Sequence, residues 1–407
     1  MLEYFYQVPL ILKRLRSGAS SPYIDRFAGK LKDEGYSPWT ATRHLRSAVH
    51  FGHFLQRQAL SVESVDEETL VEFERHQPCT CLYFRGGTTE GGYRGARLFV
   101  DYLRELGIVR VPESPQIPLV ESFQHWLDHR LGLKRSTQHR YGQGAAALVE
   151  AVGDDPAQYN ARNLRDFVLE HSRHHGRGGT ASLCTAVRAF LRFLATQGHC
   201  QAGLEHSIPT LHGWPESSPP EHLTPTEVEL VLASCNETSA IGLRNHAILL
   251  FLARLGLRAG DVVGLRFDDM DWPDGSFMVC GKASREVRLP LPQQVGDALL
   301  NYLPHRPDAN TDKVFVRHKA PLGPLTTASV SMIATAAMER VGVKTKSRGA
   351  HLLRHTAATH MLRQGVGLSQ IGAVLRHRSQ DMTAHYAKVD FDLLQEVIQP
   401  WPENPSC

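Results

Sequence analysis

The sequence predicts a mainly α-helical protein in three parts, of which the last also holds a small β-sheet. In residues 1–200 the apolar residues recur with i, i+3, i+4 spacing, as in helices that pack one face against a core. Proline gathers around 111–118 and again from about 201 to 221. Because proline removes a backbone donor and fixes φ, neither stretch can lie inside a helix. The predicted parts are 1–110, 113–200 and 222–407, with 201–221 as a linker.

Length and composition describe an ordinary globular chain. The 407 residues are too many for one compact core, and 42% hydrophobic with 21% charged residues excludes a disordered or fibrous protein. The longest apolar run, Ala247 to Ala253, is too short to span a bilayer, and the N-terminus lacks the order of a signal peptide. The seven scattered cysteines argue against a disulfide framework. We expect a cytoplasmic protein with no membrane association.

The first two parts look like degenerate copies of one small helical domain. Three groups of residues match, at offsets of 97, 94 and 91: Thr40 and Arg43 with Thr137 and Arg140; Leu70 and Phe73 with Leu164 and Phe167; Phe99, Tyr102, Leu103 and Gly107 with Phe190, Phe193, Leu194 and Gly198. Small loop deletions would leave such a shrinking offset. Chance similarity between amphipathic helices is the alternative explanation.

The third part begins with helices, changes to strands and returns to helices. Thr224-Pro225-Thr226-Glu227 predicts a helix start, with a capping threonine, proline at the first position and glutamate three residues after the cap. Residues 275–291 carry short alternating runs around Gly281, which predict a β-hairpin or small sheet. From about Leu325 the pattern is helical again, and an amphipathic helix is expected at 391–398.

Four short stretches of this part carry polar residues that a plain core would not need. Arg258 follows a glycine-containing turn, and Lys282 follows Gly281 at the hairpin. Spacing of i, i+3 places His351 and Arg354 on one helix face. His377 precedes Tyr386 by nine residues. Taken singly, each has an ordinary explanation as a surface arginine, a hydrogen-bonded histidine or a half-buried tyrosine.

Together, and in this order, the stretches resemble the tyrosine recombinase (phage integrase) family, which includes the Xer recombinases. The resemblance covers 222–407 and rests on Gly256-Leu257-Arg258, Gly281-Lys282, His351 to His360, Leu375-Arg376-His377 and Thr383-Ala384-His385-Tyr386. It implies an α+β catalytic domain with six active-site residues: Arg258, Lys282, His351, Arg354, His377 and Tyr386. It also implies that 113–200 is the family's helical (SAM-like) core-binding domain. The extra copy at 1–110 is similar to that of longer recombinases from transposable elements.

The six residues suit cleavage of a phosphodiester. The two arginines are always protonated and can hold the charged phosphate oxygens bidentately. The resemblance implies the other roles: Tyr386 attacks the phosphorus, His351 takes its proton, Lys282 protonates the leaving 5′ oxygen and His377 binds a phosphate oxygen. The product is a covalent 3′-phosphotyrosine, which a 5′ hydroxyl can reverse. This intermediate stores the energy of the broken bond, so no cofactor is expected.

The sequence lacks two further kinds of site, and it departs from the family's motifs at three positions. There is no GxxxxGK[ST] phosphate loop, so ATP binding is not predicted. His76, Cys79 and Cys81 have no second ligand pair at zinc spacing, so no metal site is predicted. The family commonly has glycine where this chain has Arg376 and Ala283, and glutamate where this chain has Asp261. Arg376 either adds a phosphate contact or faces solvent. His355 is expected to position its neighbours, and His360 to be a polar core residue.

The resemblance implies double-stranded DNA as the partner and a tetramer on DNA, formed with identical or related recombinases. Because the net charge is only +3, the phosphate contacts must be local. The candidates are Lys134, Arg135, Arg140, Arg173, Arg177, Lys344, Lys346 and Arg348. The extra N-terminal domain would bind flanking DNA or serve assembly, and the tail helix would pack on its own domain or on a neighbour.

The expected function is a site-specific recombinase or integrase of a mobile element. Its alternatives are a type IB topoisomerase-like nicking-closing enzyme and a non-catalytic DNA-binding relative.

Overall fold

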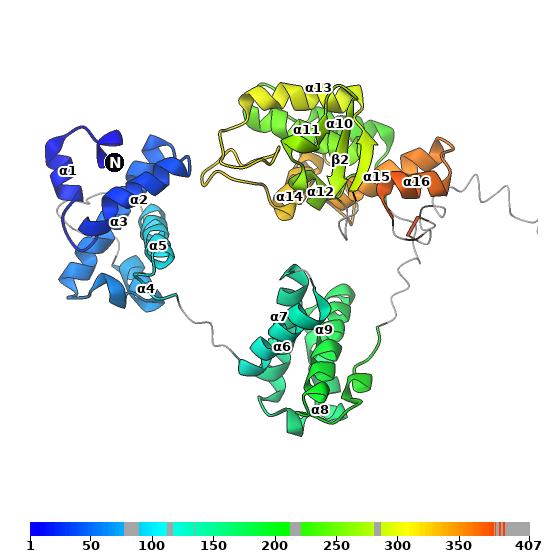
Figure 1. Cartoon of the computed structure of the whole chain (residues 1–407), viewed down its shortest axis with the longest axis horizontal. Helices are drawn as coiled ribbons and strands as arrows, with labels where there is room; N and C mark the ends of the chain where they lie inside the picture. Colours follow the sequence, from blue (N-terminus) through cyan, green and yellow to red (C-terminus); the bar gives the residue numbers. More distant parts are fainter. Residues whose placement is uncertain are drawn as a thin grey trace, which may run out of the picture. The chain divides into compact units, whose positions relative to one another are not determined.

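The computed structural model describes residues 1–76, 89–111, 117–133, 135–211, 221–280, 286–377, 379, 382, 383 and 386, with side chains omitted for 89–92. The expected mainly helical architecture with one small sheet is confirmed (Figure 1). The chain forms two compact units, one of residues 111–215 and one of residues 1–110 together with 216–407. Each is described by itself below. The predicted helix at 391–398 lies outside the described residues.

In the unit 111–215 the described residues form a bundle of four helices. They are α6 (Pro118–Leu131), α7 (Arg135–Val152), α8 (Ala161–His174) and α9 (Arg177–Thr196), with short 3₁₀ turns at Pro156–Gln158 and Leu204–Ser207. One apolar face of each helix contributes to a shared core that includes Phe123, Leu148 and Phe190. A Cβ at Gly144 of α7 would lie 2.7 Å from that of Ala186 on α9, so glycine is what lets these two helices approach so closely.

Residues 1–110 form a second helical body with its own core. Its elements are the 3₁₀ turn Leu2–Tyr4, α1 (Pro9–Leu15), α2 (Ser21–Asp33), α3 (Pro38–Arg57), the 3₁₀ turn Val62–Ser64, α4 (Glu67–Arg75) and α5 (Thr89–Glu105). Phe27, Phe51, Phe73 and Phe99 are fully buried in it. From α2 to α5 the order of helices and 3₁₀ turn matches that from α6 to α9. This order is what the predicted duplication requires, and the duplication itself stays a prediction.

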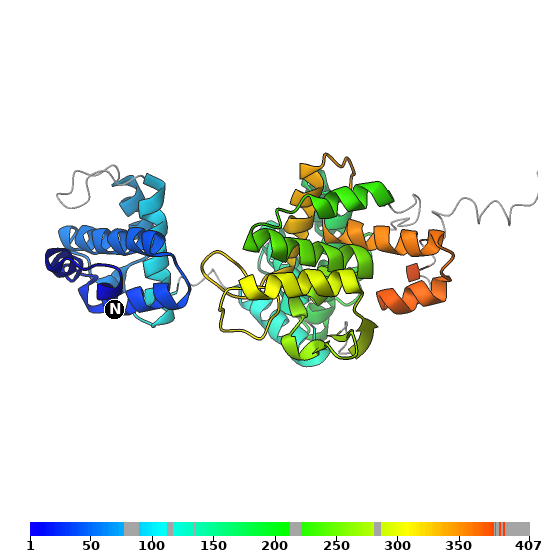
Figure 2. The ribbon, with the colours of Figure 1, turned by 90° about the horizontal axis from the view of Figure 1, so that it is seen from above.

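Residues 221–386 hold the three-stranded sheet within a helical body. The helices are α10 (Pro225–Ala233), α11 (Ala240–Leu255), α12 (Ala259–Gly264), α13 (Gln293–Tyr302), α14 (Thr327–Arg340), α15 (Ala350–Arg363) and α16 (Leu368–Leu375), with 3₁₀ turns at Phe267–Asp269 and Leu303–His305. The antiparallel strands β1 (Met270–Asp271), β2 (Ser276–Cys280) and β3 (Glu286–Pro290) lie in sequence order, with Phe277 opposite Leu289. In Figure 2 α13 runs alongside α11, and Leu249 of α11 and Leu299 of α13 belong to the same hydrophobic core.

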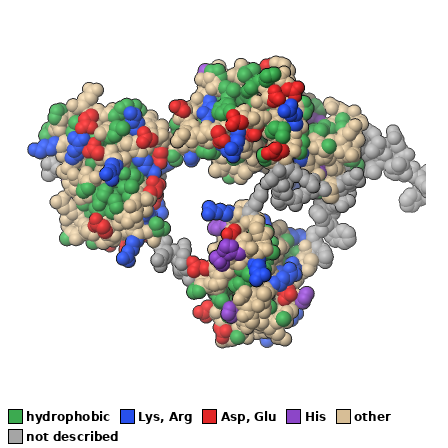
Figure 3. All heavy atoms as spheres, viewed as in Figure 1, with side chains coloured by type: hydrophobic (Ala, Val, Ile, Leu, Met, Phe, Trp, Pro, Cys, Tyr) green, Lys and Arg blue, Asp and Glu red, His purple; other side chains and the backbone are tan. Residues whose placement is uncertain are grey.

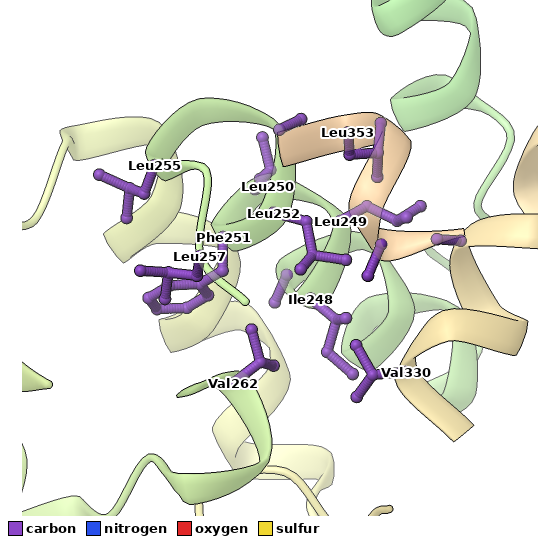
Figure 4. Packing of buried hydrophobic residues seen from close by; sticks show 14 of the residues in the cluster. Ile248, Leu249, Leu250, Phe251, Leu252, Leu255, Leu257, Val262, Val330 and Leu353 are labelled. Atoms are coloured by element: carbon purple, nitrogen blue, oxygen red, sulfur yellow. The ribbon is translucent and has the colours of Figure 1, made fainter. Parts of the chain in front are cut away.

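Two sequence features explain why this body folds as it does. The predicted cap is present: Thr224 Oγ1 accepts from the N–H of Glu227 at 3.2 Å, and the Glu227 carboxylate accepts from the N–H of Thr224 at 2.8 Å. The run from Ala247 to Leu252 is buried on every side, as expected for a helix that is apolar all round. Figure 4 shows this central helix, α11, packed against residues of its neighbours, among them Leu353 of α15.

Candidate active site

Arg258 lies in a tight turn between α11 and α12. Gly256 ends α11 with φ +58°, the left-handed conformation that glycine adopts at little cost. A Cβ there would lie 2.6 Å from Cδ2 of Leu375 at the end of α16. The backbone N–H of Arg258 donates to Asp261 Oδ2 at 2.9 Å. The turn therefore fixes where the Arg258 side chain leaves the backbone and places that point next to the end of α16.

Arg354 lies on α15 and is only 4% exposed. Its Nη1 donates to the carbonyl of Gly256 and its Nη2 to that of Leu375. Burial, and then the positive charge of Arg258, lower its pKa to about 10, so the guanidinium stays protonated at neutral pH. Arg258 Nη2 donates to the carbonyl of Arg376 at 3.3 Å. Two arginines that are far apart in the sequence are thus bound to the carbonyls of consecutive residues, Leu375 and Arg376.

Tyr386 lies within the electrostatic reach of this arginine pair and is 3% exposed. Its hydroxyl is 2.9 Å from Nδ1 of His355. Its ring is nearly parallel to that of His377, with centroids 6.1 Å apart and an angle of 8° between the planes. Burial raises the pKa of the phenol, and the charges of Arg354 and Arg258 act in the opposite direction by favouring the phenolate.

His377 follows α16, and its Nδ1 is 2.7 Å from Oγ1 of Thr383. Burial, followed by the charges of Arg354 and Arg258, lowers the pKa of His377 to about 4. The ring is therefore neutral at physiological pH. A neutral imidazole carries one N–H and one acceptor nitrogen, so His377 is able to give a single hydrogen bond to an anionic oxygen.

Of the two histidines in the first turns of α15, His355 is the one bonded to the phenol, and the role expected of His351 stays a prediction. His351, expected to take the phenol's proton, lies exposed in the first turn of α15. His355 follows one turn later, and the two rings stack with centroids 5.9 Å apart. His355, expected only to position its neighbours, makes the direct contact with Tyr386. The i, i+4 spacing of the two histidines is the sequence signal that could have identified His355.

Arg376 and His360 are both held within the protein. The side chain of Arg376 is 6% exposed and forms an ion pair with Asp261, so the alternative that it faces solvent is wrong. His360 Nε2 lies 3.0 Å from the carbonyl oxygen of Leu223, which fits its expected place as a polar core residue. Lys282 and its neighbour Ala283 lie outside the described residues.

The residues predicted to contact phosphates are spread over two units and differ in their surroundings. Arg135 and Arg140 are exposed on α7, Arg177 begins α9, and Lys344 and Lys346 are exposed after α14. Two members form ion pairs: Arg173 with Glu170 at 2.6 Å, and Arg348 with Glu339 at 2.8 Å. Lys134 lies outside the described residues.

The described ranges hold neither a metal-binding cluster nor a membrane-spanning helix. No three His, Cys, Asp or Glu side chains there gather closely enough to hold a metal ion. Cys79 and Cys81 lie outside those ranges. No helix in the described part of the chain is long and apolar enough to cross a membrane.

Comparison with known proteins places the chain in a family. A sequence model of the phage integrase family matches residues 221–392. A Sinorhizobium fredii protein named as an integrase/recombinase, y4rA, is 30% identical over 98% of this chain and 99% of its own length. The chain belongs to the phage integrase family. Members of this family, the tyrosine recombinases, cleave and rejoin DNA.

Other relatives agree with this assignment. Tyrosine recombinase XerD of Halalkalibacterium halodurans is 28% identical over 68% of this recombinase and 95% of its own length. Among solved structures, XerH bound to a palindromic difH substrate aligns with a TM-score of 0.57 and 16% identity, over 88% of this chain and 96% of that one. A lambda integrase dimer bound to a COC′ core site aligns with a TM-score of 0.54 and 17% identity, over 71% and 98%. At these identities the structures show the shared fold.

Proposed function

We propose that this recombinase cuts one strand of duplex DNA by attack of Tyr386 on the phosphorus and rejoins strands by the reverse reaction. The observation that carries the proposal is the place of the phenol: its hydroxyl meets His355, its ring lies against His377, and Arg354 and Arg258 favour its ionised form. A nucleophile with a base in hydrogen-bond reach and cations at the reacting centre suits phosphoryl transfer.

The step balances without a further reactant. The phenol oxygen forms a bond to phosphorus while the bond from phosphorus to the 5′ oxygen breaks. The phenol's proton passes to His355, and the 5′ oxygen takes up a proton, for which Lys282 is the candidate donor. Each guanidinium carries five N–H donors, so one that is bound to carbonyls still has others for the phosphate oxygens. Losing one such donor typically costs a factor of about 10² to 10³ in rate.

We further propose that the DNA is gripped by both helical domains, 1–110 and 113–200, with 201–221 as the linker to the catalytic domain 222–407. Exposed arginines support this: Arg43 on α3 and Arg140 on α7 are equivalent under the offset of 97. Figure 3 shows Lys and Arg side chains on the visible faces of these bodies. The exposed Lys344 and Lys346 would contact phosphates from the catalytic domain.

The biological setting follows from the same proposal. The solved relatives include a lambda integrase tetramer on a Holliday junction and a Tn1549 transposon integrase bound to a circular intermediate DNA. We propose that this chain likewise acts as a tetramer, on the DNA of a mobile element and in the cytoplasm. Exchange between two sites, rather than relaxation of one supercoiled circle, would distinguish it from a topoisomerase-like enzyme.

The test is capture of the covalent intermediate. Duplexes that the full-length protein selects from a random pool, nicked close to the cut, should trap a protein–DNA adduct that survives denaturing electrophoresis. Tyr386→Phe should abolish the adduct while DNA affinity is retained. Tyr302→Phe makes the same chemical change at a fully buried tyrosine of α13 and should leave the adduct intact. An adduct formed by Tyr386→Phe, or none formed by the wild type on a duplex it binds, would overturn the proposal.

A further inference from the structure

Arg376 combines two features that packing alone would not favour. It is one of two non-glycine residues with positive φ among those described, at φ +55° and ψ +51°. For a residue with a Cβ this left-handed conformation costs about 1–2 kcal/mol. Its guanidinium is buried against a carboxylate, Asp261, that is itself only 8% exposed. Burying two charges is costly unless geometry repays it, so the pair calls for a reason beyond stability.

The contacts of the pair converge on the first catalytic arginine. Asp261 Oδ2 accepts from Arg376 Nη2 and also from the backbone N–H of Arg258. The carbonyl of Arg376 accepts in turn from Arg258 Nη2. Arg258 is thus held at its backbone through the carboxylate and at its guanidinium through the carbonyl, and both restraints lead to Arg376. A closed ring of hydrogen bonds joins the start of α12 to the end of α16.

The same turn serves the rest of the site. The residue before Arg376 supplies the carbonyl that accepts from Arg354, and the residue after it is His377. Nε and Nη1 of Arg376 are buried and have no hydrogen-bond partner within the described part of the chain. A guanidinium that forms one ion pair and leaves two nitrogens unsatisfied is poorly explained as a stabilising device.

We propose that Arg376 is a positioning residue, which together with Asp261 holds the Arg258 guanidinium where it meets the scissile phosphate. The family commonly has glycine here, which takes the left-handed turn without strain. This chain instead accepts the strained turn, and the Arg376 side chain fixes the Asp261 carboxylate that holds the backbone of Arg258. The inference rests on the proposed cleavage reaction and adds to it the group that sets the direction of one of its arginines.

The test compares a charged and a neutral substrate. On the nicked duplex that the wild type cleaves, Arg376→Gly should slow adduct formation about 10- to 100-fold, the scale on which small misplacements at a reacting centre act. On the same duplex with a neutral methylphosphonate at the cut position, Arg258 has no phosphate charge to neutralise, and the loss should shrink to within about threefold. An equal loss on both substrates would mean that Arg376 serves only the fold, and would overturn the proposal.

A second variant tests whether the effect passes through the ion pair. Asp261→Asn keeps an oxygen for the N–H of Arg258 but removes the charge, so it should slow cleavage as Arg376→Gly does. The double variant should be no slower than either single one. Losses that multiply would show that Arg376 acts independently of Asp261, and would overturn the proposal. Ala59→Gly, at the other described non-glycine residue with positive φ, is the control for adding glycine at such a position.

The outcomes separate this inference from the function on which it rests. If the wild type forms no adduct on a duplex that it binds, the cleavage reaction itself is wrong. If the wild type forms the adduct and Arg376→Gly matches it on both substrates, only the positioning role is wrong. Unchanged DNA affinity and hydrogen exchange in α16 show that a slow variant is folded.

Discussion

The helical bodies 1–110 and 111–215 each contain a pair of closely packed helices, and a glycine makes the close approach possible in both. The glycine lies on the second helix of the pair in the first body and on the first helix in the second body. Where α3 crosses α5, a Cβ on Gly95 would lie 2.6 Å from the Cβ of Ser47. Where α7 crosses α9, the Cβ that would clash belongs to Gly144, and its neighbour is Ala186. Ser47 and Gly144 are equivalent under the offset of 97, as Gly95 and Ala186 are under that of 91. What the two bodies share is the close crossing, and either helix can supply the missing side chain.

The two bodies differ in whether their histidines are buried. Residues 1–110 bury His44 and His50 on α3. The equivalent positions on α7 are Tyr141 and Ala147, while in 117–211 the histidines lie at or near the surface. Burial lowers the pKa of both His44 and His50 to about 4, with smaller contributions from neighbouring positive groups. The two bodies should therefore respond differently to acid.

The largest expected effect is a selective loss of the first body at low pH. An unfolded histidine has a pKa near 6.5, so between about 6.5 and 4 the unfolded chain binds more protons than the folded one. The stability from neutral His44 and His50 is complete above that window and is lost as the pH falls through it. From pH 7 to pH 5 the loss is on the order of 2 kcal/mol per histidine. Hydrogen exchange, corrected for its intrinsic pH dependence, should show α3 opening while α7 stays protected.

The matched control replaces these histidines by the residues of the other body. His44→Tyr with His50→Ala should lower the protection of α3 at pH 7, because the packing changes, but should remove most of the extra loss at pH 5. Equal loss of protection in α3 and α7 of the wild type would contradict the contrast between the two bodies.

A smaller effect on stability is expected when the glycine is moved from one of the two crossing helices to the other. Gly144→Ala brings two Cβ atoms to 2.7 Å, and overpacking of this kind costs about 1–3 kcal/mol, offset by about 1 kcal/mol of helix propensity. Adding Ala186→Gly should restore the room and recover most of the loss. Gly95→Ala with Ser47→Gly is the mirror experiment in the first body. Exchange rates of the crossing helices measure both, and a Gly144→Ala variant stabilised by the full helix propensity of about 1 kcal/mol would remove the argument for a required close approach.

Local signals were enough to predict most of the fold. The cap at Thr224 needs only residues within one turn, and the apolar helix around Ala247 needs only composition. Shared apolar positions predict the repeat, which the order of the helices allows and which stays a prediction. The position of the glycine on one or the other of two paired helices could not be predicted, because residue-by-residue matching looks for the same residue at the same place.

Motif spacing predicted the candidate site as single residues. It named Arg258, Arg354 and Tyr386, which the structure brings within electrostatic reach of one another, and their catalytic roles stay a prediction. The burial of Arg376 depends on Asp261, 115 positions away in the sequence. The family commonly has glycine at the position of Arg376, so the resemblance gave no indication of this ion pair. The bond from His355 to Tyr386 joins residues 31 positions apart in the sequence. Long-range partners of this kind leave no local pattern.

The smallest expected effect concerns DNA binding. It decides whether residues 1–110 bind DNA phosphates as residues 113–200 are proposed to do. Arg43 lies over the ring of Trp39 at 4.7 Å and Arg140 over that of Tyr141 at 5.9 Å, and both arginines are exposed. If both bodies bind phosphates, Arg43→Ala and Arg140→Ala should each weaken binding a few-fold and lower the slope of log K against log salt by about 1. Arg173→Ala, which removes an arginine already paired with Glu170, should change the slope less. If only Arg140→Ala alters the slope, then 113–200 binds DNA and 1–110 serves protein contacts. The two bodies would then share the order of their helices but differ in the surface that each presents.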